Sequence, residues 1–255
     1  MHKKNHIIQV NNLTKSFGEF MAVKDISFEV YENEIFGILG PNGAGKTTTL
    51  EIIETLQKPS SGTVLVDGYD VTKRPLDVKQ RIGVQLQSAG FYPELTLVEL
   101  LKMFAAMYDT EVDPMKMLAK VQLEDKAKSY VNKLSGGQRQ RFSIASTLVN
   151  NPKIIFLDEP TTGLDPQARI NLWELIREIH KTGVTVVLTT HYLEEAETLC
   201  DRVAIMDEGK VMAIESPKKL IQDLLQSGFK KKAVVEQANL EDVFLHMTGR
   251  SLREE

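Results

Sequence analysis

The sequence predicts an α/β fold with an N-terminal antiparallel β region and an inserted α-helical subdomain. Three observations support this prediction. Short apolar runs of strand length alternate with turn residues in the first third of the chain. A glycine-rich turn joins one of these runs to a segment with helical periodicity. From about residue 90 to residue 149 the pattern becomes helical, and strands and helices then alternate again.

The first third of the chain is expected to contain four strands and one helix. The strands are apolar, are bounded by turn residues, and cover residues 7–10, 26–30, 35–39 and 63–66. The segment 46–56 follows the glycine-rich turn and carries leucine and isoleucine at helical spacing. We therefore expect a helix that starts directly after the glycine loop.

The middle region, about residues 90–149, is expected to be the helical insertion. Thr96 and Glu99 have the spacing of a capping box, which closes the start of a helix. Apolar residues follow with a period of about 3.6 residues, and they are Leu97, Leu100, Leu101 and Phe104. This pattern predicts an amphipathic helix.

The second half of the chain returns to alternating strands and helices. Expected strands cover 154–157 and 184–190, and an expected hairpin joins 203–206 to 211–214. Between the first two strands, a helix that Gly183 ends should carry one apolar face. That face consists of Leu172, Leu175, Ile176 and Ile179.

We expect residues 1–216 to form one domain and residues 217–255 a short C-terminal extension with one or two helices. Within this extension an apolar face could belong to a small docked helix, which Asn239 could cap and Gly249 could end. The face consists of Leu240, Val243, Phe244 and Met247. The lysine run 230–232 is interpreted as a solvated turn.

Composition excludes several classes of protein. With 255 residues and 42% hydrophobic content the chain can fill a sizeable core, and its net charge of -4 counts against nucleic acid as the main partner. Cys200 is the only cysteine, so no internal disulfide is expected. The sequence has neither a signal-peptide pattern nor an apolar run near the roughly 20 residues of a membrane span. We expect a cytoplasmic protein that reaches a membrane only through another chain.

The glycine-rich turn matches the pattern G-x-x-x-x-G-K-[ST] between a strand and a helix, which is the context expected of a phosphate-binding loop. It consists of Gly40, Pro41, Asn42, Gly43, Ala44, Gly45, Lys46 and Thr47, followed by Thr48. Backbone N–H groups of such a loop point at phosphates, and the helix adds the positive end of its dipole. Lys46 should reach the β and γ phosphates of a nucleotide, and the Thr47 hydroxyl should bind Mg²⁺.

Two adjacent carboxylates, Asp158 and Glu159, end the apolar strand 154–157. Buried charge is unfavourable unless it serves a cation or a reaction. Asp158 is expected to hold Mg²⁺ through water. Glu159 is expected to act as the general base on an attacking water.

The segment 134–138, Leu-Ser-Gly-Gly-Gln, predicts a second anion site. Ser135 and Gln138 fit a capping box at the start of a helix, with the exposed pair Gly136 and Gly137 between them. This helix start lies in the helical region, so one chain cannot easily bring it to the nucleotide on its own phosphate loop. In a head-to-tail dimer each chain would supply Ser135 and Gly137 to the nucleotide of the other.

In this order, the segments 40–47, 134–138 and 154–159 resemble the nucleotide-binding domain of ATP-binding-cassette (ABC) proteins, and the resemblance covers about residues 7–216. It implies a P-loop NTPase (RecA-like) core that binds ATP and Mg²⁺ and hydrolyses ATP. It also implies roles for four further residues. Phe17 would stack on adenine in place of the more usual tyrosine, and Gln87 would contact Mg²⁺ and the attacking water, with Gln85 as a lower-ranked competitor. Asp165 would lie at the dimer interface, and His191 would contact the γ-phosphate.

The short single cassette and its ending, residues 240–252, resemble the ATPase subunits of bacterial drug and antibiotic exporters (ABC-2 type). This resemblance implies a homodimer on the cytoplasmic face of the cell membrane, bound to a separate integral membrane permease. Phe91 and Tyr92 either face that permease or pack the hinge of the helical region. The alternative is a soluble ABC ATPase, such as an iron-sulfur assembly ATPase. A P-loop kinase or GTPase is disfavoured because neither needs the segment 134–138.

Overall fold

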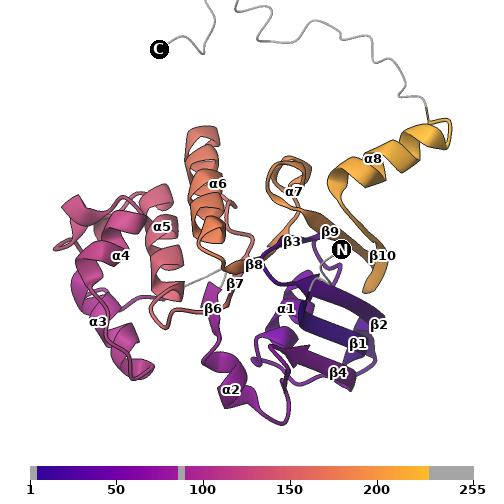
Figure 1. The fold of residues 1–255 in the computed structure, drawn as a ribbon, viewed down its shortest axis with the longest axis horizontal. Coiled ribbons are helices and arrows are strands. Elements are labelled where there is room, and N and C mark those ends of the chain that lie inside the picture. Colours follow the sequence, from indigo (N-terminus) through magenta and orange to yellow (C-terminus); the bar gives the residue numbers. More distant parts are fainter. Residues whose placement is uncertain (1–4, 86–89, 230–255) are drawn as a thin grey trace, which may run out of the picture. The chain divides into compact units, whose positions relative to one another are not determined.

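The computed structural model describes residues 5–85 and 90–229. The chain divides into two compact units, Met1–Leu220 and Ile221–Glu255. The first unit contains two β-sheets, a group of helices inserted between strands, and further helices that connect the strands (Figure 1). The predicted α/β fold is therefore confirmed.

The N-terminal sheet is antiparallel, as predicted. Among the described residues it has the strand order β2-β1-β4-β5. The strands are β1 (His6–Phe17), β2 (Phe20–Tyr31), β4 (Ser61–Val66) and β5 (Tyr69–Asp70). β1 and β2 are longer than their apolar runs because the hairpin continues through polar residues up to the turn at Gly18. Sequence periodicity detects only the half-buried part of such a hairpin.

The second sheet forms the centre of the unit, with the order β10-β9-β3-β8-β7-β6 among the described strands. These strands are β3 (Ile35–Leu39), β6 (Ile82–Gln85), β7 (Ile154–Asp158), β8 (Thr185–Thr190), β9 (Arg202–Asp207) and β10 (Lys210–Glu215). All neighbouring pairs are parallel except β9 and β10. Every residue of β3, β7 and β8 is buried. Because the carboxyl ends of parallel strands meet at one edge, the residues that follow β3, β7 and β8 gather there.

Four described helices lie beside this sheet, and the sequence analysis predicted only the first and the third of them. They are α1 (Lys46–Ile53), α2 (Pro75–Lys79), α6 (Pro166–Lys181) and α7 (Leu193–Leu199). The helix expected at 46–56 ends at Ile53, and the physical reason is that Thr55 takes the left-handed conformation with φ of 67°. α6 ends near Gly183, as expected, and Gly183 has φ of 95°.

The inserted subdomain contains α3 (Leu97–Met107), α4 (Pro114–Lys120), α5 (Gly136–Thr147) and two 3₁₀ turns (Glu124–Lys126 and Val131–Lys133). α3, α4 and α5 form one group (Figure 1). Their shared core includes Leu100, Leu118 and Phe142, each fully buried. The predicted capping box at the start of α3 is present, with the Thr96 N–H donating to Glu99 Oε2 at 2.8 Å.

The last described helix is α8 (Pro217–Gln226). In the second unit the described residues are 221–229, and Ile221, Leu224 and Leu225 are exposed there. The helix expected around 239–249 and the lysine run 230–232 lie outside the described residues. None of the helices that the structure describes is both long and apolar enough to cross a bilayer.

Candidate nucleotide-binding and catalytic site

The glycine-rich segment forms a tight loop between the end of β3 and the start of α1. Gly45 has φ of 94°, and a Cβ there would lie 2.5 Å from the carbonyl oxygen of Ala22 in β2. A Cβ on Gly40 would lie 2.2 Å from the carbonyl oxygen of Met206 in β9. Only glycine fits at these two positions. The loop therefore lies close against both strands, and the N-terminus of α1 faces its interior.

Lys46 places its ammonium group inside this loop. The side chain is 5% exposed, and Nζ donates to the carbonyl oxygens of Gly40 at 2.9 Å and Pro41 at 3.1 Å. Nζ also lies 3.5 Å from Glu159 Oε1. The Lys46 ammonium therefore lies between the predicted phosphate-binding loop and Glu159, the predicted general base.

Thr47 and Asp158 form an oxygen-rich pair next to the loop. Thr47 Oγ1 lies 3.4 Å from both carboxylate oxygens of Asp158, which is 6% exposed. A hydroxyl and a carboxylate are the hard ligands that Mg²⁺ prefers beside phosphates. Among residues 5–85 and 90–229 no cluster of three or more His, Cys, Asp or Glu could hold a metal by itself. Thr47 and Asp158 therefore fit a Mg²⁺ ion whose remaining ligands are phosphate oxygens and water.

Thr189 in β8 forms hydrogen bonds with both Asp158 and Glu159, and the sequence analysis did not identify it. Its hydroxyl donates to Asp158 Oδ1 and accepts the N–H of Glu159 at 3.0 Å. The contact arises because Thr189 is the register partner of Asp158 in the parallel pair β7–β8. The sequence signal was the pair of threonines that ends β8 after the apolar run Val186, Val187 and Leu188.

Glu159 and His191 meet at the carboxyl ends of β7 and β8. His191 Nδ1 lies 3.2 Å from Glu159 Oε2. Thr162 Oγ1 donates to the same oxygen at 3.2 Å. Burial opposes the charge of Glu159, but His191, Lys46 and Thr162 together outweigh burial and hold the pKa of this carboxyl below its usual value. Glu159 is therefore ionised at neutral pH, which is the form a general base needs.

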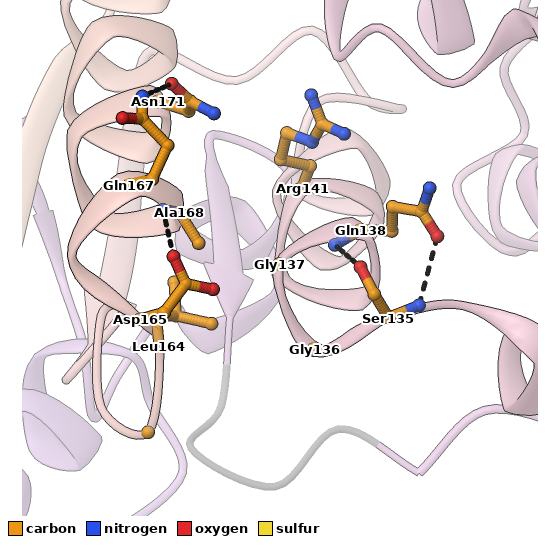
Figure 2. Close-up of a pocket in the computed structure, with 11 residues that line it drawn as sticks. Ser135, Gly136, Gly137, Gln138, Arg141, Leu164, Asp165, Gln167, Ala168 and Asn171 are labelled. Carbon is orange, nitrogen blue, oxygen red and sulfur yellow. Dashed lines mark hydrogen bonds between the residues drawn. The ribbon is translucent and has the colours of Figure 1, made fainter. Parts of the chain in front are cut away.

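The segment 134–138 forms a helix start with a complete capping box. The Gln138 N–H donates to Ser135 Oγ at 3.3 Å, and the Ser135 N–H donates to Gln138 Oε1 at 3.0 Å. Asp165 caps α6 in a similar way, with its Oδ1 accepting the Ala168 N–H at 2.8 Å. Figure 2 shows these two helix starts facing each other across one pocket of about 480 Å³.

Within one chain, this pocket and the phosphate loop are separate. The loop lines another pocket, of about 410 Å³, with Lys46, Thr47 and Glu159 among its walls. Ser135, Gly136, Gly137, Gln138 and Asp165 line the first pocket and not the second. The residues predicted to bind the nucleotide thus line two separate pockets of this chain, and we call these two groups of residues, one around Lys46 and one around Ser135, the half-sites of the predicted nucleotide site.

Phe17 lies at the end of β1 and does not line the loop pocket. It is 48% exposed, and the Lys15 ammonium lies 4.9 Å from its ring centroid. Its neighbour across the hairpin, Phe20, is 64% exposed and does line the pocket. Sequence reasoning missed Phe20, which is the second aromatic candidate for stacking on a base.

Gln87 lies outside the described residues and stays a prediction. Gln85, at the end of β6, is 2% exposed, and its Oε1 has no hydrogen-bond partner among the residues described. Phe91 packs against Phe104 and Phe142, with ring centroids 6.2 Å and 5.2 Å apart. It therefore packs the hinge of the helical region, whereas Tyr92 is 58% exposed.

Glu54, which follows α1, is a buried acid that makes the stability of the fold depend on pH. Burial, with the charges of Asp158 and Glu51, raises its pKa from 4.5 to about 8. The folded protein therefore keeps a proton that the unfolded chain releases, and stability falls as pH rises from about 4.5 to about 8.

Glu54→Gln should remove this loss. At pH 8 the variant should unfold with a free energy up to about 5 kcal/mol above that of the original protein, at about 1.36 kcal/mol per pH unit. Urea unfolding between pH 5 and about pH 8 measures it. Glu174→Gln, an exposed position on α6, is the control. Equal pH slopes for the Glu54 variant and the original protein would contradict the prediction.

Together, the fold and this arrangement define a P-loop nucleotide-binding protein with a second pocket, at the capped start of α5, on the same chain. Comparison with known proteins specifies the class further. Residues 23–162 match the family model described as "ABC transporter". The Nod factor export ATP-binding protein I of Burkholderia lata is 36% identical, over 97% of this chain and 98% of the relative. The linearmycin resistance ATP-binding protein LnrL of Bacillus subtilis is 39% identical, over 82% of this chain and 68% of the relative.

A solved structure is also similar over most of its length. The ATP-binding cassette MJ0796, in a dimeric post-hydrolysis state bound to ADP and Pi, is 30% identical over 82% of this chain and 98% of that chain, with a TM-score of 0.74. This chain belongs to the ABC transporter family, and within it to the ATP-binding subunits that bind and hydrolyse ATP. The predicted family, fold and activity are confirmed, and the exporter names of the relatives agree with the resemblance to the exporter group.

Proposed function

We propose that this chain is the ATP-hydrolysing subunit of a membrane exporter and that it works as a head-to-tail dimer with two nucleotides at its interface. The observation that carries the proposal is the division of the site into two half-sites, one around Lys46 and one around Ser135. A two-fold dimer pairs each half-site with the other half-site of its partner. The export names of relatives over 30% identical support the direction of transport.

Each composite site would divide the chemistry between the two chains. Lys46 and the loop N–H groups bind the phosphates, while Ser135 and Gly137 of the partner approach the γ-phosphate from the other side. Thr47 and Asp158 would hold Mg²⁺, which when bound neutralises charge on the phosphates. Glu159 accepts a proton from the attacking water, and His191 orients the γ-phosphate beside it.

The permease would dock in a groove between the sheet and the helical subdomain. The groove has a volume of about 290 Å³ and combines aromatic and apolar walls with Gln85 and Asn150. Gln85 Oε1 and Asn150 Oδ1 are buried acceptors without a hydrogen-bond partner among the described residues. Met107, on the wall, is 67% exposed. An amphipathic segment of a membrane protein, with donors on one face, fits this combination.

The test is a pull-down of the tagged protein from its native membranes in mild detergent, with ATPase activity measured in the same eluate. We expect a co-purifying protein with several membrane spans, to which the chain would bind on the cytoplasmic face of the membrane. Met107→Glu should lose that protein and keep ATP binding. Leu76→Glu, at a site that is 74% exposed on α2, should keep both. Recovery of soluble partners alone would favour a soluble ABC ATPase, such as an iron-sulfur assembly ATPase.

A further inference from the structure

Helix α6 connects the two half-sites of the chain. Its N-terminus is capped by Asp165, which lines the Ser135 pocket. Its side faces α7, which begins directly after the segment of His191 and Tyr192 (Figure 1). The first turn of α6, beside the Ser135 pocket, and its contacts with α7 therefore belong to one continuous helix.

Several contacts join α6 to α7 and to its N-cap Tyr192, among them a hydrogen bond from the Arg177 guanidinium to the Thr198 carbonyl oxygen at 2.8 Å. The Arg169 guanidinium lies 5.6 Å from the centroid of the Tyr192 ring. Four residues later, the Trp173 indole N–H donates to Glu195 Oε1 at 3.1 Å. Residues four apart on a helix share one face, as do residues three apart on the facing helix. We call Arg169, Trp173, Tyr192 and Glu195 the α6–α7 clasp.

The clasp reaches the catalytic carboxylate through Tyr192. The ring centroids of Tyr192 and His191 are 4.2 Å apart. The Tyr192 N–H donates to Thr190 Oγ1 at 3.0 Å, which fixes the turn that carries His191. His191 Nδ1 then lies 3.2 Å from Glu159 Oε2. Tyr192 therefore limits where the imidazole can lie relative to Glu159.

The other end of the clasp lies against the Ser135 pocket. Arg169 is in the first turn of α6, and its N–H donates to the Asp165 carbonyl at 3.0 Å. α5 lies close by, since a Cβ on Gly137 would come within 3.2 Å of Ala168 Cβ. The first turn of α6 therefore forms part of the wall of the Ser135 pocket, and the same turn carries Arg169, which contacts Tyr192.

Trp173 and Glu195 form the buried interior of the clasp. Glu195 is fully buried and Trp173 is 6% exposed. Arg169 Nε is a buried donor without a hydrogen-bond partner among the described residues. The contact with the Tyr192 ring is therefore an attraction between a cation and an aromatic face, at a guanidinium whose Nε makes no hydrogen bond to a described residue.

We propose that the α6–α7 clasp sets the position of His191 against Glu159 and thereby the rate of ATP hydrolysis on the chain's own phosphate loop. Arg169 and Tyr192 are positioning residues in this device. The inference rests on the roles proposed above for Glu159 and His191.

The first test measures kcat and ATP affinity separately on the full chain. Tyr192→Ala should lower kcat about 10-fold with ATP affinity unchanged, because the nucleotide contacts remain and only the imidazole loses its support. Tyr192→Phe keeps the ring and should restore kcat to within about 2-fold of the original protein. Leu193→Ala, at the next residue and 67% exposed, is the matched control and should leave kcat unchanged.

The second test removes His191. In a His191→Ala background, measured by single turnover, Tyr192→Ala should lower the rate no further, because Tyr192 acts through the imidazole. Equal losses with and without His191, or a wild-type kcat for Tyr192→Ala, would overturn the clasp. If His191→Ala alone kept the original rate, the proposed catalytic role of His191 would be wrong. This outcome distinguishes an error in the proposed function from an error in the clasp.

Discussion

Replacing Glu159 by Gln is expected to stop ATP hydrolysis and to leave a stable ATP-bound dimer. Glutamine has the same shape but cannot accept the proton of the attacking water, so kcat should fall at least about 100-fold. ATP binding depends on the loop and on Lys46, which the substitution leaves in place. The two nucleotides then stay intact and hold the two chains together.

Size-exclusion chromatography with light scattering measures this outcome at saturating MgATP. Glu208→Gln is a suitable control. Glu159 and Glu208 both have a positive φ, of 47° and 46°, but Glu208 lies in the β9–β10 hairpin. This control should hydrolyse ATP at the original rate. A Glu159→Gln protein that stays monomeric with bound MgATP would speak against the dimer with nucleotides at its interface.

Ser135→Arg is expected to abolish hydrolysis while ATP affinity stays nearly the same. Ser135 lines the pocket that faces α6 and not the pocket of the phosphate loop. An arginine there fills the half-site that the partner's nucleotide needs. The substitution also removes a capping box, which lowers stability by about 1 kcal/mol. Thr96→Arg removes the equivalent box on α3 and controls for that loss.

Mixing two inactive variants gives a sharper form of the same experiment. Lys46→Ala disables one half-site and Ser135→Arg disables the other. A head-to-tail heterodimer of the two contains one composite site with both residues intact, so mixing should restore part of the ATPase activity. If Ser135 served the nucleotide on its own chain, each protein would stay inactive and mixing would restore nothing. Loss of ATP binding by Ser135→Arg alone would lead to the same conclusion.

Contiguous motifs made much of this site predictable from sequence. The phosphate loop, both capping boxes and the Asp158-Glu159 pair each lie within a few residues, so their local geometry follows from short-range rules. The strand β7 was predictable because it is a continuous apolar run of strand length, and the helix α6 because its buried residues recur at helical spacing.

Contacts between residues far apart in the sequence could not be predicted from these short-range rules. Thr189 meets Asp158 only because β7 and β8 pair in one particular register. Phe20 replaces Phe17 in the wall of the loop pocket because the β1–β2 hairpin turns between them. The contact of Arg169 with Tyr192 depends on how α6 packs on α7, which no local pattern encodes.

The clasp also determines which part of the protein its intrinsic tryptophan fluorescence monitors. Trp173 is the only tryptophan in the sequence, so the indole fluorescence of the chain arises entirely from the inside of this joint. Indole emission responds to the polarity and hydrogen bonding around its N–H, and here the acceptor is the carboxyl of Glu195. The protein therefore contains an unlabelled optical probe at the joint between the helix that Asp165 caps and the segment that carries His191.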